Sequence, residues 1–110
     1  MIRVTYWRTL HRVVVDGHAN SGEYGKDLVC AAASALALTL AENLRILEKN
    51  GQVRNTLTVL KDGRAEIACE PYRRCKSVTT LILDSVCAGY DVLSREYPDY
   101  ILFEISEALG

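Results

Sequence analysis

The sequence predicts an α+β fold, a two-layer sandwich in which two helices cover a mixed sheet. Two kinds of segment predict it: short runs rich in β-branched residues that alternate in polarity, and two long runs with helical spacing. Their order is strand-strand-helix-strand-strand-helix-strand, without the regular alternation of a doubly wound fold. The 110 residues contain no repeat or linker, so we expect one domain over residues 1–110.

Residues 2–8 and 11–17 are the first two predicted strands, joined by a short link at Thr9 and Leu10. Alternation places Tyr6 and Trp7 on opposite faces, so one is expected in the core and the other on the surface or in a dimer contact. His11 falls within the second strand pattern, and we expect it on the exposed face.

The first helix is predicted from Asp27 to about Lys49. Asp27 is a favourable N-cap, and Asn50-Gly51 offers a left-handed stop. Its first half is apolar all round, which predicts burial on several sides. The most apolar run, residues 28–41, is shorter than the ~20 residues of a membrane span, so we expect a core helix and no membrane partner.

A hairpin and a second helix follow. Residues 53–60 and 65–70 flank "KDGR", and an Asp-Gly pair between two alternating runs is a strong hairpin signal. Apolar residues recur at helical spacing from about Cys75 to Glu96, and Pro98 stops that helix. Residues 99–105, "DYILFEI", form the last predicted strand.

Composition narrows the class of protein. Apolar content of 49%, charged content of 25% and a net charge of −1 are those of a globular domain without the basic field of a nucleic-acid binder. We therefore expect no direct nucleic-acid binding, and we interpret the densest basic run, Tyr72 to Lys76, as a solvated turn and helix start. The amino terminus lacks the pattern of a signal peptide, which favours a cytoplasmic protein.

The cysteines of a cytoplasmic protein are expected to be reduced thiols. The spacing of Cys69 and Cys75 matches no common zinc site, so no metal is expected. Cys69 and Cys87 are interpreted as small core hydrophobes.

His18 and Cys30 are the candidate catalytic pair. His18 ends the second predicted strand, and Cys30 falls in the first turn of the first predicted helix. A thiol with a reference pKa near ~8.5 is mostly un-ionised at neutral pH. The free N–H groups and positive pole of a helix start favour the thiolate, a nearby imidazole can take its proton, and the same N–H groups could support an oxyanion.

The ordinary alternative is that Cys30 packs in an alanine-rich helix and that His18 follows a strand at a capped turn. The intervening loop favours the catalytic interpretation. It is too polar for burial, is longer than a simple link requires, and carries Gly22 and Gly25, which permit unusual backbone angles or hinging.

These residues also carry a resemblance to a known family. The motif elements are Gly17-His18-Ala19, Gly25-Lys26-Asp27-Leu28-Val29-Cys30 and Ser34-Ala35-Leu36. This pattern is similar to the signature of the ribosomal-processing cysteine protease family, Prp, and the likeness extends over essentially the whole chain. The opening "MIRVTYWR" and residues 89–101 resemble the ends of the family, while the loop "NSGE" and Ala33 depart mildly from it.

The resemblance implies a homodimeric bacterial endopeptidase that needs no cofactor. It would remove a short N-terminal extension from large-subunit ribosomal protein number twenty-seven, with Cys30 as nucleophile and His18 as general base and later acid. The alternative is a non-catalytic ribosome- or precursor-binding module of the same fold. Thiol redox or acyl transfer at the same pair is a third possibility, for which no resolving cysteine lies nearby in sequence.

The neighbouring residues have supporting roles at most. Asp27 could orient His18, but a carboxylate close to Cys30 would oppose ionisation of the thiol, so helix capping is favoured. Ser34, one turn from Cys30, either bonds back to a helix carbonyl or lines the cleft, and the resemblance favours the cleft. Tyr24 and Lys26 could close over a substrate.

Overall fold

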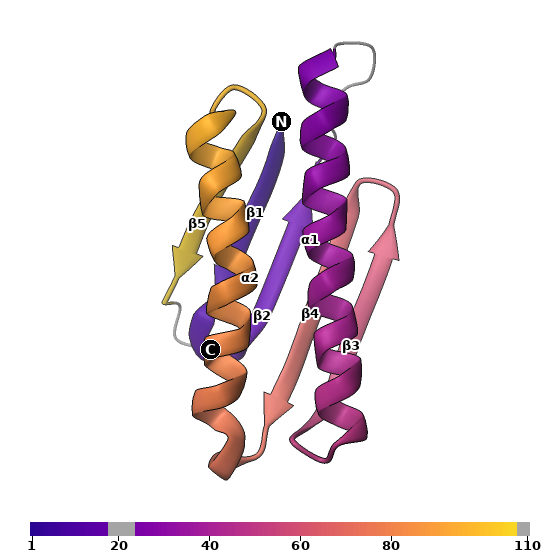
Figure 1. Ribbon diagram of the computed structural model, residues 1–110, viewed down its shortest axis with the longest axis vertical. Helices are drawn as coiled ribbons and strands as arrows, with labels where there is room; N and C mark the ends of the chain where they lie inside the picture. Colours follow the sequence, from indigo (N-terminus) through magenta and orange to yellow (C-terminus); the bar gives the residue numbers. More distant parts are fainter. Residues whose placement is uncertain (18–23, 108–110) are drawn as a thin grey trace.

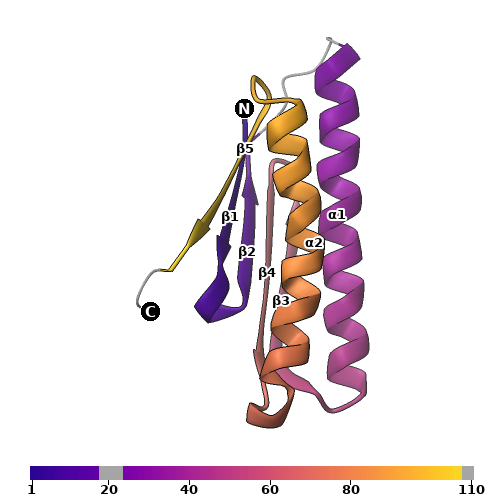
Figure 2. The same ribbon diagram turned by 60° about the vertical axis from the view of Figure 1, so that its left-hand side comes forward.

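The computed structural model describes residues 1–17 and 24–107. Two helices cover one face of a five-stranded sheet, and the two views show both helices on the same side of it (Figure 1, Figure 2). The predicted fold class and order of elements are confirmed. The elements are β1 (Ile2–Trp7), η1 (Arg8–Leu10), β2 (Arg12–Asp16), α1 (Tyr24–Lys49), β3 (Val53–Lys61), β4 (Arg64–Pro71), η2 (Arg73–Cys75), α2 (Lys76–Glu96) and β5 (Ile101–Ser106).

The sheet is mixed, with the strand order β3-β4-β2-β1-β5. Strand β1 pairs antiparallel with β2, where Val4 lies opposite Val15, and parallel with β5, where Val4 lies opposite Phe103. Because β4 pairs antiparallel with β2, the β3–β4 hairpin turns at the same edge at which β2 ends.

The core lies between the helices and this face of the sheet. Alternation in β1 turns Ile2, Val4 and Tyr6 toward the helices, as a half-buried strand requires. Each helix buries residues spaced by three or four positions, the period of one helical face. In α1 these are Val29, Ala33, Ala37, Leu40, Leu44 and Leu47, and in α2 they are Thr79, Leu83, Cys87 and Tyr90.

Helix α1 covers the sheet with one face only. The prediction of burial on several sides is wrong, because α1 forms the outer layer and leaves Leu38 57% exposed. By length and a mean hydropathy of 1.3, Leu28–Lys49 would also suffice to cross a membrane. In the fold 28% of its most apolar window is buried, and that part is the stripe packed against the sheet.

The two helices approach closely near the beginning of α1. The Tyr90 hydroxyl donates a buried hydrogen bond of 3.0 Å to the Ala33 carbonyl oxygen. A Cβ atom added at Gly89 would lie 2.8 Å from Cδ2 of Leu36, so the absence of a side chain allows this spacing. The Tyr90 ring also stacks with Phe103 at 6.4 Å. These contacts fix the turn of α1 that follows Cys30.

Two glycines adopt the left-handed backbone conformation at turns that the sequence predicts. Gly51 ends α1 with a φ of 71°, and the N–H of Gln52 donates to the Leu47 carbonyl oxygen at 2.9 Å. Gly63, with a φ of 75°, turns the hairpin in which Lys61 pairs with Arg64. Both predictions are confirmed.

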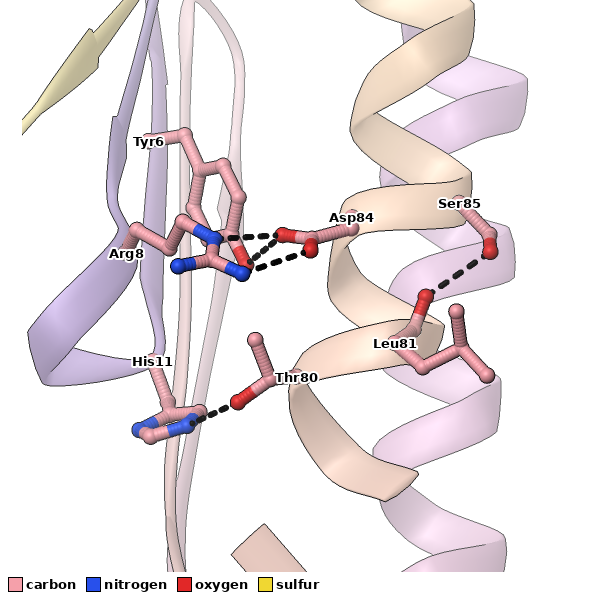
Figure 3. Close-up of polar contacts among 7 residues, drawn as sticks. All are labelled: Tyr6, Arg8, His11, Thr80, Leu81, Asp84 and Ser85. Carbon is pink, nitrogen blue, oxygen red and sulfur yellow. Dashed lines mark hydrogen bonds and ion pairs between the residues drawn. The ribbon is translucent and has the colours of Figure 1, made fainter. Parts of the chain in front are cut away.

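Polar contacts fasten the other end of α2 to the sheet (Figure 3). Asp84 accepts hydrogen bonds from the Tyr6 hydroxyl at 2.8 Å and from Nε and Nη2 of Arg8 at 3.0 Å each. His11 Nε2 lies 2.9 Å from the Thr80 hydroxyl oxygen. His11 is only 5% exposed, so its predicted exposure is wrong. The η1 turn places it at a left-handed φ of 50°, outside the alternation of β2.

Candidate active site

Cys30 lies on a pocket of about 180 Å³ between the beginning of α1 and the sheet. Helix α1 contributes small side chains to it, and β1, β2 and the β3–β4 hairpin form the remaining walls. The pocket is too small for a whole peptide and suits part of one, since sites for drug-sized ligands have roughly 300–1,000 Å³. Its lining residues are Ile2, Val15, Gly17, Cys30, Ala33, Ser34, Ala37, Lys61, Asp62, Gly63, Arg64 and Ala65.

The end of β2 is held against this pocket by Gly17, the residue that precedes His18. The Gly17 N–H donates a hydrogen bond of 2.9 Å to the Gly63 carbonyl oxygen. Gly17 has a φ of +104°, and an added Cβ atom would collide with the Met1 carbonyl oxygen. Only glycine therefore fits here without rearrangement.

The hairpin residues Lys61 to Arg64 belong to the site, although sequence reasoning did not include them. Their Asp-Gly signal predicts the turn, but its position depends on the pairing of β4 with β2, in which Asp16 lies opposite Arg64. Nη1 of Arg64 lies 3.7 Å from Oδ2 of Asp16. This non-local pairing brings charged residues to the rim of the pocket.

The structure brings Cys30 and Ser34 together on one wall of the pocket. The structure describes the other residues predicted for the site only in part. His18 and Gly22 lie outside the described residues. Tyr24, Gly25, Lys26 and Asp27 form the first turn of α1, and their side chains lie outside the described part of the structure.

The beginning of α1 corrects two predictions. The helix starts at Tyr24, so Asp27 lies within its first turn and is not the N-cap. A carboxylate in the first turn is as favourable to the helix dipole as one at the cap, so composition alone does not separate the two positions. Cys30 consequently lies in the second turn, not the first. The free N–H groups of a helix belong to its first turn, and the dipole effect fades beyond that turn.

The other three cysteines are poor nucleophiles. Cys69, Cys75 and Cys87 are buried, whereas Cys30 is half-buried. Burial raises the pKa of the Cys69 thiol to about 11 and that of Cys87 to about 12, and the thiolate is the reactive form. Within residues 1–17 and 24–107, no group of three or more His, Cys, Asp or Glu residues could hold a metal ion.

His11 does not take part in this site. It lies at the turn between β1 and β2 and faces Thr80 of α2, whereas Cys30 is near the end of β2, at the opposite edge of the sheet (Figure 1, Figure 3). Burial, and next the positive charges of Lys76 and Arg8, lower the pKa of its imidazole.

A family model and curated relatives that are similar to this chain carry the same family name. A family model described as cysteine protease Prp matches residues 1–102. Two curated proteins of Staphylococcus aureus, both named ribosomal processing cysteine protease Prp, are 67% identical to this chain over 24 residues. That match covers 22% of this chain and spans 23% of the relatives' length.

Solved structures extend the likeness to the whole fold. SMU.848 from Streptococcus mutans has a TM-score of 0.72 at 29% identity, over 96% of this chain and 93% of that one. An essential ribosomal processing protease Prp from S. aureus, in complex with a covalently linked product peptide, has a TM-score of 0.68 at 25% identity, over 96% and 97% of the two chains. With its match to the family model over residues 1–102, the chain belongs to the cysteine protease Prp family.

Proposed function

We propose that this chain is a cysteine endopeptidase that removes a short N-terminal extension from large-subunit ribosomal protein number twenty-seven and thereby supports ribosome assembly. The observation that carries the proposal is the position of half-buried Cys30 on a pocket that also contains Gly17, the residue before His18. The family supports the peptidase class. The covalently linked product peptide of the S. aureus relative is what a nucleophilic mechanism is expected to leave.

In this mechanism the thiolate of Cys30 attacks the scissile carbonyl carbon, and His18 takes the thiol proton. Collapse of the tetrahedral intermediate breaks the peptide C–N bond, and protonated His18 gives its proton to the leaving amine. Water then attacks the thioester, with His18 as general base, and releases the acid and Cys30. Because Cys30 lies beyond the first turn of α1, the imidazole supplies more of the activation than the helix dipole does.

The small side chains around Cys30 leave room for the peptide. This face of α1 carries only the short side chains of Ala33, Ser34 and Ala37, which leave space above the helix. The opposite side of the pocket is apolar because Ile2 and Val15 line it. An extended, largely apolar peptide suits such a surface. Tyr24 and Lys26 are proposed to contact the bound peptide, and Gly22 and Gly25 to let the intervening loop close over it. No cofactor is proposed.

Incubation of the ribosomal precursor with the protein, followed by mass spectrometry, tests the activity, the cleavage site and the nucleophile together. We expect a single truncated product with the natural chain and none with Cys30→Ala. A product that persists with Cys30→Ala would exclude Cys30 as the nucleophile. An intact precursor with both proteins, together with retained binding, would favour the non-catalytic module.

Alkylation by iodoacetamide tests the pair independently of the substrate. We expect rapid, stoichiometric modification of Cys30 at a pH of about 6–7, lost in His18→Ala, since the thiolate reacts and the imidazole stabilises it. Reaction that is equally slow in both proteins and accelerates only above a pH of about 8 would support the binding module.

We further propose that the protein is a cytoplasmic homodimer. Leu38 of α1 and Leu81 of α2 support it, because they are 57% and 64% exposed on the helix layer. Light scattering after size-exclusion chromatography is expected to give twice the mass of one chain. A mass of one chain at micromolar concentration would contradict the dimer.

A further inference from the structure

The fold gathers basic residues at the end of the molecule remote from Cys30. Arg54 at the beginning of β3 joins Arg73, Arg74 and Lys76, which surround the beginning of α2, and all four side chains are exposed. Tyr72 lies among them. We call this set, Arg54, Tyr72, Arg73, Arg74 and Lys76, the basic end. It lies at the opposite end of the sandwich from the beginning of α1 (Figure 1).

The ring of Tyr72 makes cation–π contacts with two of the four basic side chains. The guanidinium carbons of Arg54 and Arg74 lie 5.2 and 5.5 Å from the centroid of its ring. Nη2 of Arg74 also donates to the Gly51 carbonyl oxygen at 3.3 Å, and Nε of Arg54 lies 3.5 Å from Oε2 of Glu70. The two guanidinium groups are therefore held in place before any ligand arrives.

Arg73 and Lys76 carry charge that is not balanced locally. Neither forms an ion pair with an acidic side chain in the part of the chain that the structure describes. They stand at the beginning of α2, where the first turn has no acidic residue and no side chain caps the helix. Positive side chains at the positive pole of a helix are unfavourable, and a bound anion would reverse that cost.

A hollow of about 620 Å³ adjoins the basic end. Its lining includes the basic side chains of Arg12, Arg54 and Lys76 and the acidic side chain of Glu70. Glu70 pairs with Arg54, and Arg12 pairs with Glu66, so Lys76 is the cation of this lining without an acidic partner among the described residues. The basic end thus combines a concave polar surface with fixed and flexible cations, which a flat solvated turn would not provide.

We infer that the basic end binds the phosphate backbone of RNA. Arginine favours phosphate because its planar fork can donate two hydrogen bonds to one group. The guanidinium planes of Arg54 and Arg74, which lie over the Tyr72 ring, are surfaces on which unpaired bases stack, and an acidic peptide would not use them in this way. The net charge of −1 predicted no nucleic-acid binding. Folding changes the local field, since it brings Arg54 to the run from Tyr72 to Lys76, and charge acts within a Debye length of roughly 8–10 Å.

RNA bound there would leave the pocket at Cys30 open. Along α1, Lys49 is nineteen residues beyond Cys30, which corresponds to roughly 28 Å at about 1.5 Å per residue. RNA docking and peptide cleavage can therefore occur on one molecule at the same time, and RNA binding does not depend on the proposed peptidase activity.

Fluorescence anisotropy with a labelled single-stranded RNA of roughly 20 nucleotides tests the inference. We expect saturable binding at about 50 mM salt that weakens steeply as salt rises. The variant Arg73→Gln/Lys76→Gln is expected to bind at least about tenfold more weakly and to reduce the slope of log K against log salt by about 1.5. The matched control Arg3→Gln/Arg95→Gln removes the same charge at the other end and is expected to bind within about twofold of the natural chain.

Two further measurements distinguish a loss of RNA binding from a loss of folding or of peptidase activity. The Arg73→Gln/Lys76→Gln variant should unfold at an equal or slightly higher temperature, because it relieves the repulsion at the beginning of α2. It should also cleave the precursor peptide at the natural rate, so that loss of RNA binding and loss of peptidase activity remain distinct. Absence of saturable binding up to about 100 µM, an equal loss in the control variant, or tighter binding of polyglutamate than of RNA would overturn the inference.

Discussion

Gly17 and Gly63, which lie far apart in the sequence, are joined by a backbone hydrogen bond of 2.9 Å from the N–H of Gly17 to the carbonyl oxygen of Gly63. The bond fastens the end of β2 to the turn of the β3–β4 hairpin. Both glycines line the pocket that contains Cys30. The chain therefore departs toward His18 from a fixed point on the wall of the candidate active site.

Replacement of Gly17 by alanine is expected to destabilise the protein by about 2–4 kcal/mol, because strained φ and steric collision add. Gly17 has a φ of +104°, and the new Cβ would collide with the Met1 carbonyl oxygen. Urea unfolding measures the change. Gly51→Ala is the matched control: its φ is +71° and nothing lies within 4 Å of an added Cβ, so it should cost only about 1 kcal/mol. If both variants lost the same free energy of unfolding, the collision of the new Cβ atom with the Met1 carbonyl oxygen would not contribute to the loss.

The sequence predicts this fold well because its signals are local. Alternation defines β1, the Asp62-Gly63 pair defines the hairpin, and Gly51 ends α1 where the pattern indicates. The errors come from contacts between distant segments. The turn at η1 buries His11 against Thr80, and sheet pairing alone decides that Arg64 lies beside Asp16.

The candidate site is predicted less completely than the fold. Cys30 is predicted from its place near a helix start after His18, and Ser34 from its position one turn from Cys30 and from the family resemblance. The structure places both on one pocket. The hairpin wall is missed because no local pattern encodes the pairing of β4 with β2. The beginning of α1 is missed because Asp27 suits the first turn and the cap position equally well.

The stability of the protein is expected to fall as the pH decreases below about 6.5, because His11 is buried in its neutral form. Its pKa in the folded protein is lowered by burial first and then by Lys76 and Arg8, with partial opposition from Asp84. The unfolded chain therefore binds the proton first. The stability contribution is complete above the unfolded pKa of about 6.5, and it is lost as the pH falls toward the folded pKa.

Urea unfolding at several pH values from about 7.5 to 5 measures this loss, whose slope for one group is at most about 1.4 kcal/mol per pH unit. His11→Gln should flatten the profile in this range, since glutamine does not titrate. Asp84, whose pKa is lowered chiefly by its hydrogen bonds from Arg8, loses its contribution only at more acidic pH, below its ordinary value of 3.8. A profile that is unchanged by His11→Gln would assign the pH dependence to other groups.

Asp84→Ala is expected to cost about 1–3 kcal/mol, chiefly because the buried hydroxyl of Tyr6 loses its acceptor. The pairing with Arg8 adds little, since both side chains are more than one-third exposed to solvent. Thermal or urea unfolding measures the loss. Asp91→Ala, which breaks an exposed pair with Arg95 on the same helix, is the control and should cost less than about 0.5 kcal/mol.

The double variant Tyr6→Phe/Asp84→Ala separates the two contributions to that loss. Removal of the hydroxyl together with its acceptor leaves no unsatisfied buried group, so the double variant should be more stable than Asp84→Ala alone. If Tyr6→Phe instead added to the loss, the Arg8 pair would be the main source of stability at this contact.

Ser34→Leu is expected to impair cleavage of the precursor peptide by tenfold or more, mainly through a higher KM, at nearly natural stability, roughly within 0.5 kcal/mol. Ser34 is exposed and lines the pocket beside Cys30, so a leucine would occupy space that the proposed mechanism gives to the peptide. The control is Ala35→Leu, which places the same side chain on the next residue of α1, exposed and outside the pocket lining. Steady-state cleavage of a precursor peptide by both variants measures the difference. Equal KM values in the two variants would mean that the peptide reaches Cys30 by another path, even if Cys30 remains the nucleophile.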